Sequence, residues 1–80
     1  MTLTLHYFAS LRDLAGCASE AMRVPAGSDL PWLYAHLCER HGFALPRERL
    51  RVAVDGAFVA WDSALHDGAE VVFIPPVSGG

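Results

Sequence analysis

One amphipathic segment in the middle of the chain constrains the fold more than any other feature. Its apolar side chains recur at i, i+3, i+4, i+7 and i+8, on one face of an α-helix: Leu30, Leu33, Tyr34, Leu37 and Cys38. Ser28 or Asp29 suits the N-cap, and Gly42 suits the C-cap. Pro31 suits the first turn. The pattern predicts one main helix, which must bury its apolar stripe against another element.

Short extended runs flank this helix on both sides. Alternating or wholly apolar patterns predict five strands: Leu3–Ala9, Ser19–Val24, Leu50–Val54, Phe58–Trp61 and Glu70–Ile74. Ser10 is expected to cap a short helix, Leu11–Ala15, that Gly16 ends. Asp55-Gly56 predicts a hairpin turn. The order indicates an α+β domain with one helix across a mixed sheet, and parallel pairing of the first and last strands would make it the β-grasp arrangement of ubiquitin.

Chain length and composition point to a small domain with a partner. We expect 80 residues to form a single domain over 1–80, with residues 75–80 as an extended tail. A ligand pocket of about 300 Å³ or more would hollow out so small a core, which disfavours a self-contained enzyme. Hydrophobic residues make up 52% and charged residues 19%, against about 25% charged on average. Some apolar surface must therefore stay outside, as in a partner interface.

Charge and hydropathy exclude two classes of partner. The formal net charge is −3, and the six basic residues are all arginine, without the basic stripe that nucleic acid requires. We interpret Arg47, Arg49 and Arg51 as solvated loop and strand-edge residues rather than as a phosphate site. No stretch approaches the roughly 20 apolar residues of a membrane span. The first residues show no basic region followed by an apolar run, because Arg12 and Asp13 interrupt it, so we expect no signal peptide. We expect a cytoplasmic protein.

No catalytic or metal-binding constellation is visible. His36 and His41 are five residues apart, so they do not share a helix face as an i, i+4 metal pair would. His6 and His66 are isolated along the chain. Two cysteines, Cys17 and Cys38, show neither a CxxC motif nor a base partner, and we interpret them as reduced, structural thiols.

The carboxyl-terminal tail is the feature that carries chemistry. Pro75 and Pro76 fix φ and lack an N–H group, so they end the last strand and stiffen the chain. Gly79 and Gly80 lack a Cβ, so they can enter a channel that admits only backbone. Six residues beyond Ile74 reach close to 20 Å. Such a tail can thread its carboxylate into another protein's active site, and an adenylated carboxylate accepts a sulfur or amine nucleophile; the alternative is a frayed terminus.

Three segments carry a family resemblance. Residues 65–80, residues 7–16 and Val54-Asp55-Gly56 resemble the small subunit of molybdopterin synthase, a family that often has Val-Asn at the third segment. The resemblance spans the whole chain. Its most specific part is the ending Pro75-Pro76-Val77-Ser78-Gly79-Gly80.

The resemblance implies a mechanism. A ubiquitin-activating-type enzyme would adenylate the Gly80 carboxylate with ATP, and a cysteine desulfurase or rhodanese-like donor would convert it to a thiocarboxylate. The tail would then deliver sulfur to cyclic pyranopterin monophosphate in the large subunit, and two deliveries would build the molybdopterin dithiolene. The chain would bind no cofactor and would be the non-catalytic sulfur donor of a heterotetramer of two small and two large subunits.

The last strand predicts a docking patch beside this tail. Val71 and Phe73 should face the helix, which leaves Val72 and Ile74 facing outward. The alternative is a second small core under the loop of residues 43–49. The expected partner-binding residues are Phe8, Arg12, Phe58, Ile74, Pro75, Pro76, Val77 and Ser78.

Three other functions stay open. A sulfur carrier for thiamine or amino-acid biosynthesis would share the fold and chemistry, although thiamine-type carriers are usually shorter and lack the 7–16 helical insertion. A ubiquitin-like protein modifier is the second. The absence of lysine prevents lysine-linked chains on this protein itself, but not single attachment to a target. A toxin-like or purely structural interaction module, in which Gly80 would have no role, is the third.

Overall fold

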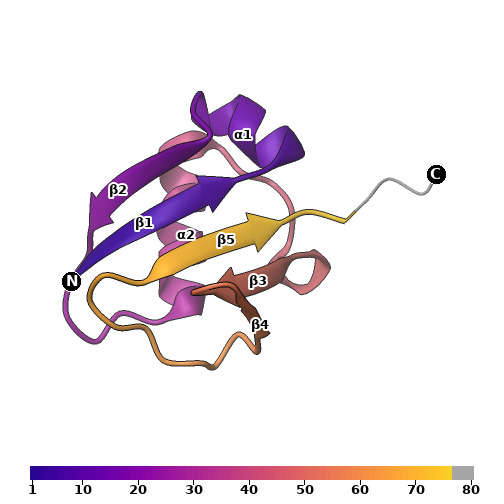
Figure 1. Ribbon diagram of the computed structural model, residues 1–80. Coiled ribbons are helices and arrows are strands. Elements are labelled where there is room, and N and C mark those ends of the chain that lie inside the picture. Colours follow the sequence, from indigo (N-terminus) through magenta and orange to yellow (C-terminus); the bar gives the residue numbers. More distant parts are fainter. Residues whose placement is uncertain (77–80) are drawn as a thin grey trace.

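One long helix crosses one face of a five-stranded sheet in the computed structural model, which describes residues 1–76 (Figure 1). The strand order is β2-β1-β5-β3-β4. Strands β1 and β5 pair in parallel at the centre, and the other neighbours are antiparallel. This arrangement confirms the predicted α+β, β-grasp fold. The elements are β1 (Thr2–Tyr7), α1 (Ala9–Ala15), β2 (Ser19–Arg23), α2 (Leu30–His41), the 3₁₀ turn η1 (Arg47–Arg49), β3 (Arg51–Val54), β4 (Ala57–Val59) and β5 (Glu70–Ile74).

The junction between β1 and α1 differs from the prediction. The strand ends at Tyr7, and Phe8 is the N-cap, because the amides of Leu11 and Arg12 both donate to its carbonyl. Ser10 therefore lies inside the first turn, and the expectation that it caps the helix is wrong. Ala9 makes the turn in the left-handed region, at φ 51°, a conformation that is strained for a residue with a Cβ.

The far edge of the sheet is also shorter than predicted. Strand β4 ends at Val59 rather than Trp61, since the indole of Trp61 turns back onto the helix side of the sheet. Its ring stacks on Phe73, with 6.0 Å between centroids, and meets Tyr34 edge-on at 5.8 Å. Packing the faces of an aromatic ring against other rings stabilises the fold more than extending a three-residue edge strand does.

Helix α2 confirms the predicted stripe and its caps. Leu30, Leu33 and Leu37 are fully buried against the sheet. Asp29 is the N-cap, and its carboxylate accepts a hydrogen bond from the amide of Trp32 at 2.9 Å. Gly42 ends the helix at φ 75°, where only glycine avoids strain.

A partly buried polar network fastens the end of α2 to the sheet. The Tyr7 hydroxyl donates to Glu20 Oε2 at 2.6 Å, and His41 Nε2 donates to the same oxygen at 2.7 Å. Burial, followed by the hydrogen bond to Glu20, raises the pKa of Tyr7, so the hydroxyl keeps its proton. Burial alone would raise the pKa of Glu20, but the hydrogen bonds from Tyr7 and His41 outweigh it and lower the pKa.

A second polar contact closes the end of the sheet opposite the tail. His66 Nε2 lies 2.6 Å from Asp55 Oδ2, and His66 Nδ1 lies 2.9 Å from the carbonyl oxygen of Asp67. Both neighbours are acceptors, so both ring nitrogens donate only when the ring is an imidazolium. The hydrogen bond to Asp55, then that to Asp67, raises the pKa of His66. The amide of Glu70, then His66, lowers the pKa of Asp55.

We predict that the His66–Asp55 pair stabilises the fold only within a limited range of pH. A raised His66 pKa contributes stability below its ordinary value of 6.5, which is lost as pH rises through the folded pKa. A lowered Asp55 pKa contributes stability above its ordinary value of 3.8, which is lost as pH falls through the folded pKa. The difference in Tm between the native chain and His66→Gln should therefore be largest between these values. Thermal melts across pH measure it.

The matched control is His36→Gln. The His36 ring stacks on Trp32, at 5.1 Å between centroids, and has no carboxylate partner among residues 1–76. The Tm difference between His36→Gln and the native chain should therefore not be largest in the same range of pH. A His66→Gln difference that stays constant with pH would contradict the imidazolium assignment.

Candidate functional site: the tail exit and the outer sheet face

Strand β5 places the start of the tail at a fixed point of the fold. It pairs with β1 on one side, up to Phe73, and with β3 on the other, up to Ile74 (Figure 1). Pro75 is buried and Pro76 is exposed. The four remaining predicted site residues lie outside the described part of the chain: Val77, Ser78, Gly79 and Gly80.

Apolar side chains cross the face of the sheet that faces away from α2. Val71 and Phe73 are fully buried on the helix side, as predicted, so Val72 and Ile74 point to the other face and are half-buried there. Val72 pairs with Ala53, which pairs with Phe58, so the three form a row across β5, β3 and β4. The Phe58 ring at the end of this row is 65% exposed.

Phe8 extends this surface at the tail end of β1. It follows Tyr7, which pairs with Phe73, and its extended backbone keeps the alternation of the strand, so its side chain shares the face of Ile74. The Phe8 side chain is 51% exposed. We call Phe8, Phe58, Val72 and Ile74 the outer patch.

The loop of residues 43–49 does not cover the outer patch. Phe43 packs on the helix side, against Tyr7 and Tyr34, with centroid distances of 5.7 and 6.2 Å. The Tyr34 hydroxyl donates to the carbonyl of Leu45 at 2.7 Å, which holds the loop there. The alternative of a second small core under this loop is therefore wrong. The rings of Phe8 and Phe58 are left to solvent or to a partner.

Helix α1 carries two further exposed side chains, Arg12 and Leu14. Arg12, a predicted partner-binding residue, lies exposed on α1, the helix that directly follows Phe8. Leu14, on the same helix, is 53% exposed and was not predicted. Its exposure follows from the short length of α1, which buries only Leu11; counting apolar residues per turn of that helix would have indicated it.

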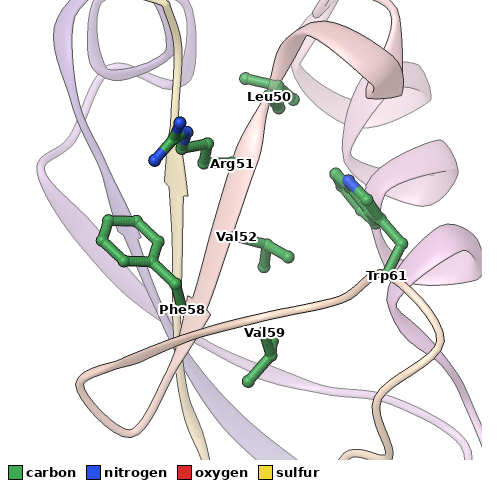
Figure 2. Close-up of a pocket in the computed structure, with 6 residues that line it drawn as sticks. All are labelled: Leu50, Arg51, Val52, Phe58, Val59 and Trp61. Carbon is green, nitrogen blue, oxygen red and sulfur yellow. The ribbon is translucent and has the colours of Figure 1, made fainter.

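A hollow of about 300 Å³ at the β3–β4 edge has no catalytic groups. Its lining is Leu50, Arg51, Val52, Phe58, Val59 and Trp61. Figure 2 shows Arg51 and Phe58 on one side of β3, and Leu50, Val52 and Trp61 on the other, toward the helix. Arg51 is the only titratable side chain in this lining, and a guanidinium does not serve as a general base.

A groove of about 370 Å³ lies at the base of the tail. Its lining is Arg49, Arg51, Ile74, Pro75 and Pro76. Sequence reasoning assigned the two arginines to solvent and missed their place beside the tail. No pattern in the sequence indicated this place, because it depends on the antiparallel pairing of β3 with β5, which sets Arg51 opposite Ile74.

The described residues meet the requirements of neither a metal site of three or more ligands nor a membrane-spanning helix. Among residues 1–76, no group of three or more His, Cys, Asp and Glu side chains is placed to hold a metal ion. Cys17 and Cys38 are both free and half-buried. No helix in this part of the chain is long and apolar enough to cross a membrane.

Comparison with known proteins assigns the chain to a family. The model of the ThiS family matches residues 5–80, which includes the whole tail. The chain belongs to the ThiS family. A curated relative of this ThiS-family chain, the molybdopterin synthase sulfur carrier subunit of Escherichia coli (strain K12), is 39% identical over 80 residues. The alignment covers 92% of this chain and 94% of the relative.

Solved structures agree with the ThiS-family fold. A putative molybdopterin converting factor, subunit 1, from Pyrococcus furiosus has a TM-score of 0.80 and 30% identity, covering 96% of this chain and 99% of its own. Two matches under 25% identity show the fold alone, each covering 100% of both chains. They are SAMP1 from Haloferax volcanii (TM-score 0.83, 24%) and the complex of subunits 1 and 2 of molybdopterin-converting factor from Helicobacter pylori 26695 (TM-score 0.70, 22%).

Proposed function

We propose that this chain is the sulfur carrier and small subunit of molybdopterin synthase. The observation that carries the proposal is its 39% identity, over nearly the full length of both chains, to a protein with that role. The fold supports it, since the last strand, β5, lies at the centre of the sheet and ends at Ile74, within the outer patch.

The reacting group is the carboxylate of Gly80. Attack of this carboxylate on ATP forms an acyl-adenylate and releases pyrophosphate, in a reaction catalysed by a ubiquitin-activating-type enzyme. A persulfide on a cysteine desulfurase or rhodanese-like donor displaces AMP, and a thiol reduces the resulting acyl disulfide to the thiocarboxylate. Transfer of that sulfur to cyclic pyranopterin monophosphate, with hydrolysis, restores the carboxylate. Gly79 and Gly80 suit this task because a narrow channel admits backbone without side chains.

The large subunit is the partner that receives the tail. The outer patch supports this, because it is an apolar surface with exposed aromatic rings at the tail exit, and such surfaces form the cores of protein interfaces. Arg12, Pro75, Pro76, Val77 and Ser78 would line the same approach. Two small and two large subunits would form the assembly.

A protein modifier is the second candidate. The same activated carboxylate would acylate a lysine of a target instead of accepting sulfur, and the fold of SAMP1 is shared. The identity to a sulfur carrier favours sulfur transfer over modification. The product formed at Gly80 decides between the two.

We predict that changing the position of the Gly80 carboxylate abolishes sulfur delivery without unfolding the domain. One alanine added after Gly80 moves the carboxylate by about 3.3 Å and introduces a Cβ. Deleting Gly80 moves it back by a similar amount. A misplacement of 1 Å can lower a rate by about 10²-fold. Both variants should melt like the native chain yet fail to support molybdopterin formation.

Intact-protein mass spectrometry measures the carrier step. After incubation with the activating enzyme, ATP and a sulfur donor, the native chain should show the mass increase of oxygen replaced by sulfur. Ser19→Ala, at an exposed position of β2 outside the tail, is the control and should be converted. Normal molybdopterin formation by the untrimmed extended chain would overturn the proposal, and conjugates to lysines in place of the thiocarboxylate would favour the modifier.

We also predict that Ile74→Arg weakens binding to the large subunit more than it weakens folding. An apolar anchor replaced by an unpaired charge typically costs more than about 2 kcal/mol of binding free energy. Thr4→Arg is the control, because Thr4 lies on the same sheet face but at the opposite end, beside Glu70. Titration calorimetry and thermal melts should separate the two variants. A collapsed melt with unchanged affinity per folded molecule would place Ile74 in the core instead.

A further inference from the structure

Two arginines border the groove at the base of the tail. Arg51 is the first residue of β3 and pairs with Ile74, the last residue of β5. Arg49 ends η1 and lines the same groove of about 370 Å³ with Ile74, Pro75 and Pro76. Both arginine side chains are exposed. The groove is therefore positively charged at the point where the chain leaves the domain.

Neither guanidinium has a carboxylate partner within the described residues. All ion pairs within 4.0 Å among residues 1–76 involve histidine. The Arg51 guanidinium lies over the Phe58 ring, at 5.8 Å from the centroid, which orients the guanidinium while leaving its N–H groups free to donate. Arg47, the third arginine of this segment, lies over Trp61 at 5.7 Å and does not line the groove.

The lining of the groove favours a carboxylate-bearing protein segment over a phosphate. Phosphate sites are usually built from several backbone N–H groups, and Pro75 and Pro76 have none to offer. The groove is instead continuous with the outer patch through Ile74 and Phe58, and arginine beside apolar and aromatic side chains is typical of protein interfaces.

We infer that the groove of Arg49 and Arg51 receives an acidic segment of the large subunit as the tail enters it. The inference rests on the function proposed above and adds an element of recognition to it. The chain as a whole carries a formal net charge of −3, so the two arginines of the groove form a local positive site on a molecule that is negative overall. The approach is thereby oriented so that the tail arrives first.

The test is the rate of association with the large subunit as a function of salt. The double variant Arg49→Gln, Arg51→Gln should associate about 10-fold more slowly than the native chain at low salt, and the two rates should converge at high salt because the charges are screened. The control is Arg23→Gln, Arg40→Gln, which removes the same charge from the exposed face of β2 and the end of α2. Its association rate should stay within about twofold of the native value.

Each outcome decides the inference. Equal rates for the native chain and the groove variant, or equal losses for both double variants, would overturn it while leaving the proposed function intact. Faster association of the groove variant would show that the chain's own terminal carboxylate occupies the groove, which also overturns it. Slower thiocarboxylate formation with unchanged large-subunit association would assign the groove to the activating enzyme, against the inference. A native chain that does not bind the large subunit at all would overturn the proposed function itself.

Discussion

The parallel pairing of β1 with β5 is the contact on which the rest of the molecule depends. It joins the first and last strands at the centre of the sheet, so the core closes only when both ends of the chain are in place. The same register sets Phe8 beside Ile74 and thereby assembles one surface from residues far apart in the sequence. Antiparallel pairing of β5 with β3 adds Arg51 and, through β4, Phe58.

Periodicity was sufficient to predict the main helix and the existence of the five strands, because burial on one face produces a regular pattern of apolar residues in the sequence. The stripe from Leu30 to Cys38 and the alternation in β5 both correspond to observed packing. Contacts between residues that are far apart in the sequence produce no such pattern, so they were not predicted. Trp61 turns into the core, and Glu20 joins Tyr7, 13 residues before it, to His41, 21 residues after it. The arginines beside the tail became a candidate only once the strand order was known.

In the proposed function, the group that reacts and the surface that binds the partner lie in different parts of the chain. The domain through Pro76 supplies an apolar patch with a charged groove at its edge, and its polar side chains are used mostly to hold elements together. In the proposed function, the chemistry belongs to the terminal carboxylate of Gly80, which lies beyond the described residues. A carrier of this kind would need no cavity of its own, because the partner would provide the enclosed site. A small core would then suffice for that function.

The central position of β5 has a mechanical consequence. A partner that grips the end of the chain applies force along β5, and the hydrogen bonds to β1 and β3 on its two edges lie across that direction. They are loaded together in shear, rather than broken one at a time as they would be if an edge strand were peeled away. The strand that leads into the tail is thus held on both edges, and pulling it from the sheet would require the hydrogen bonds on both sides to break together.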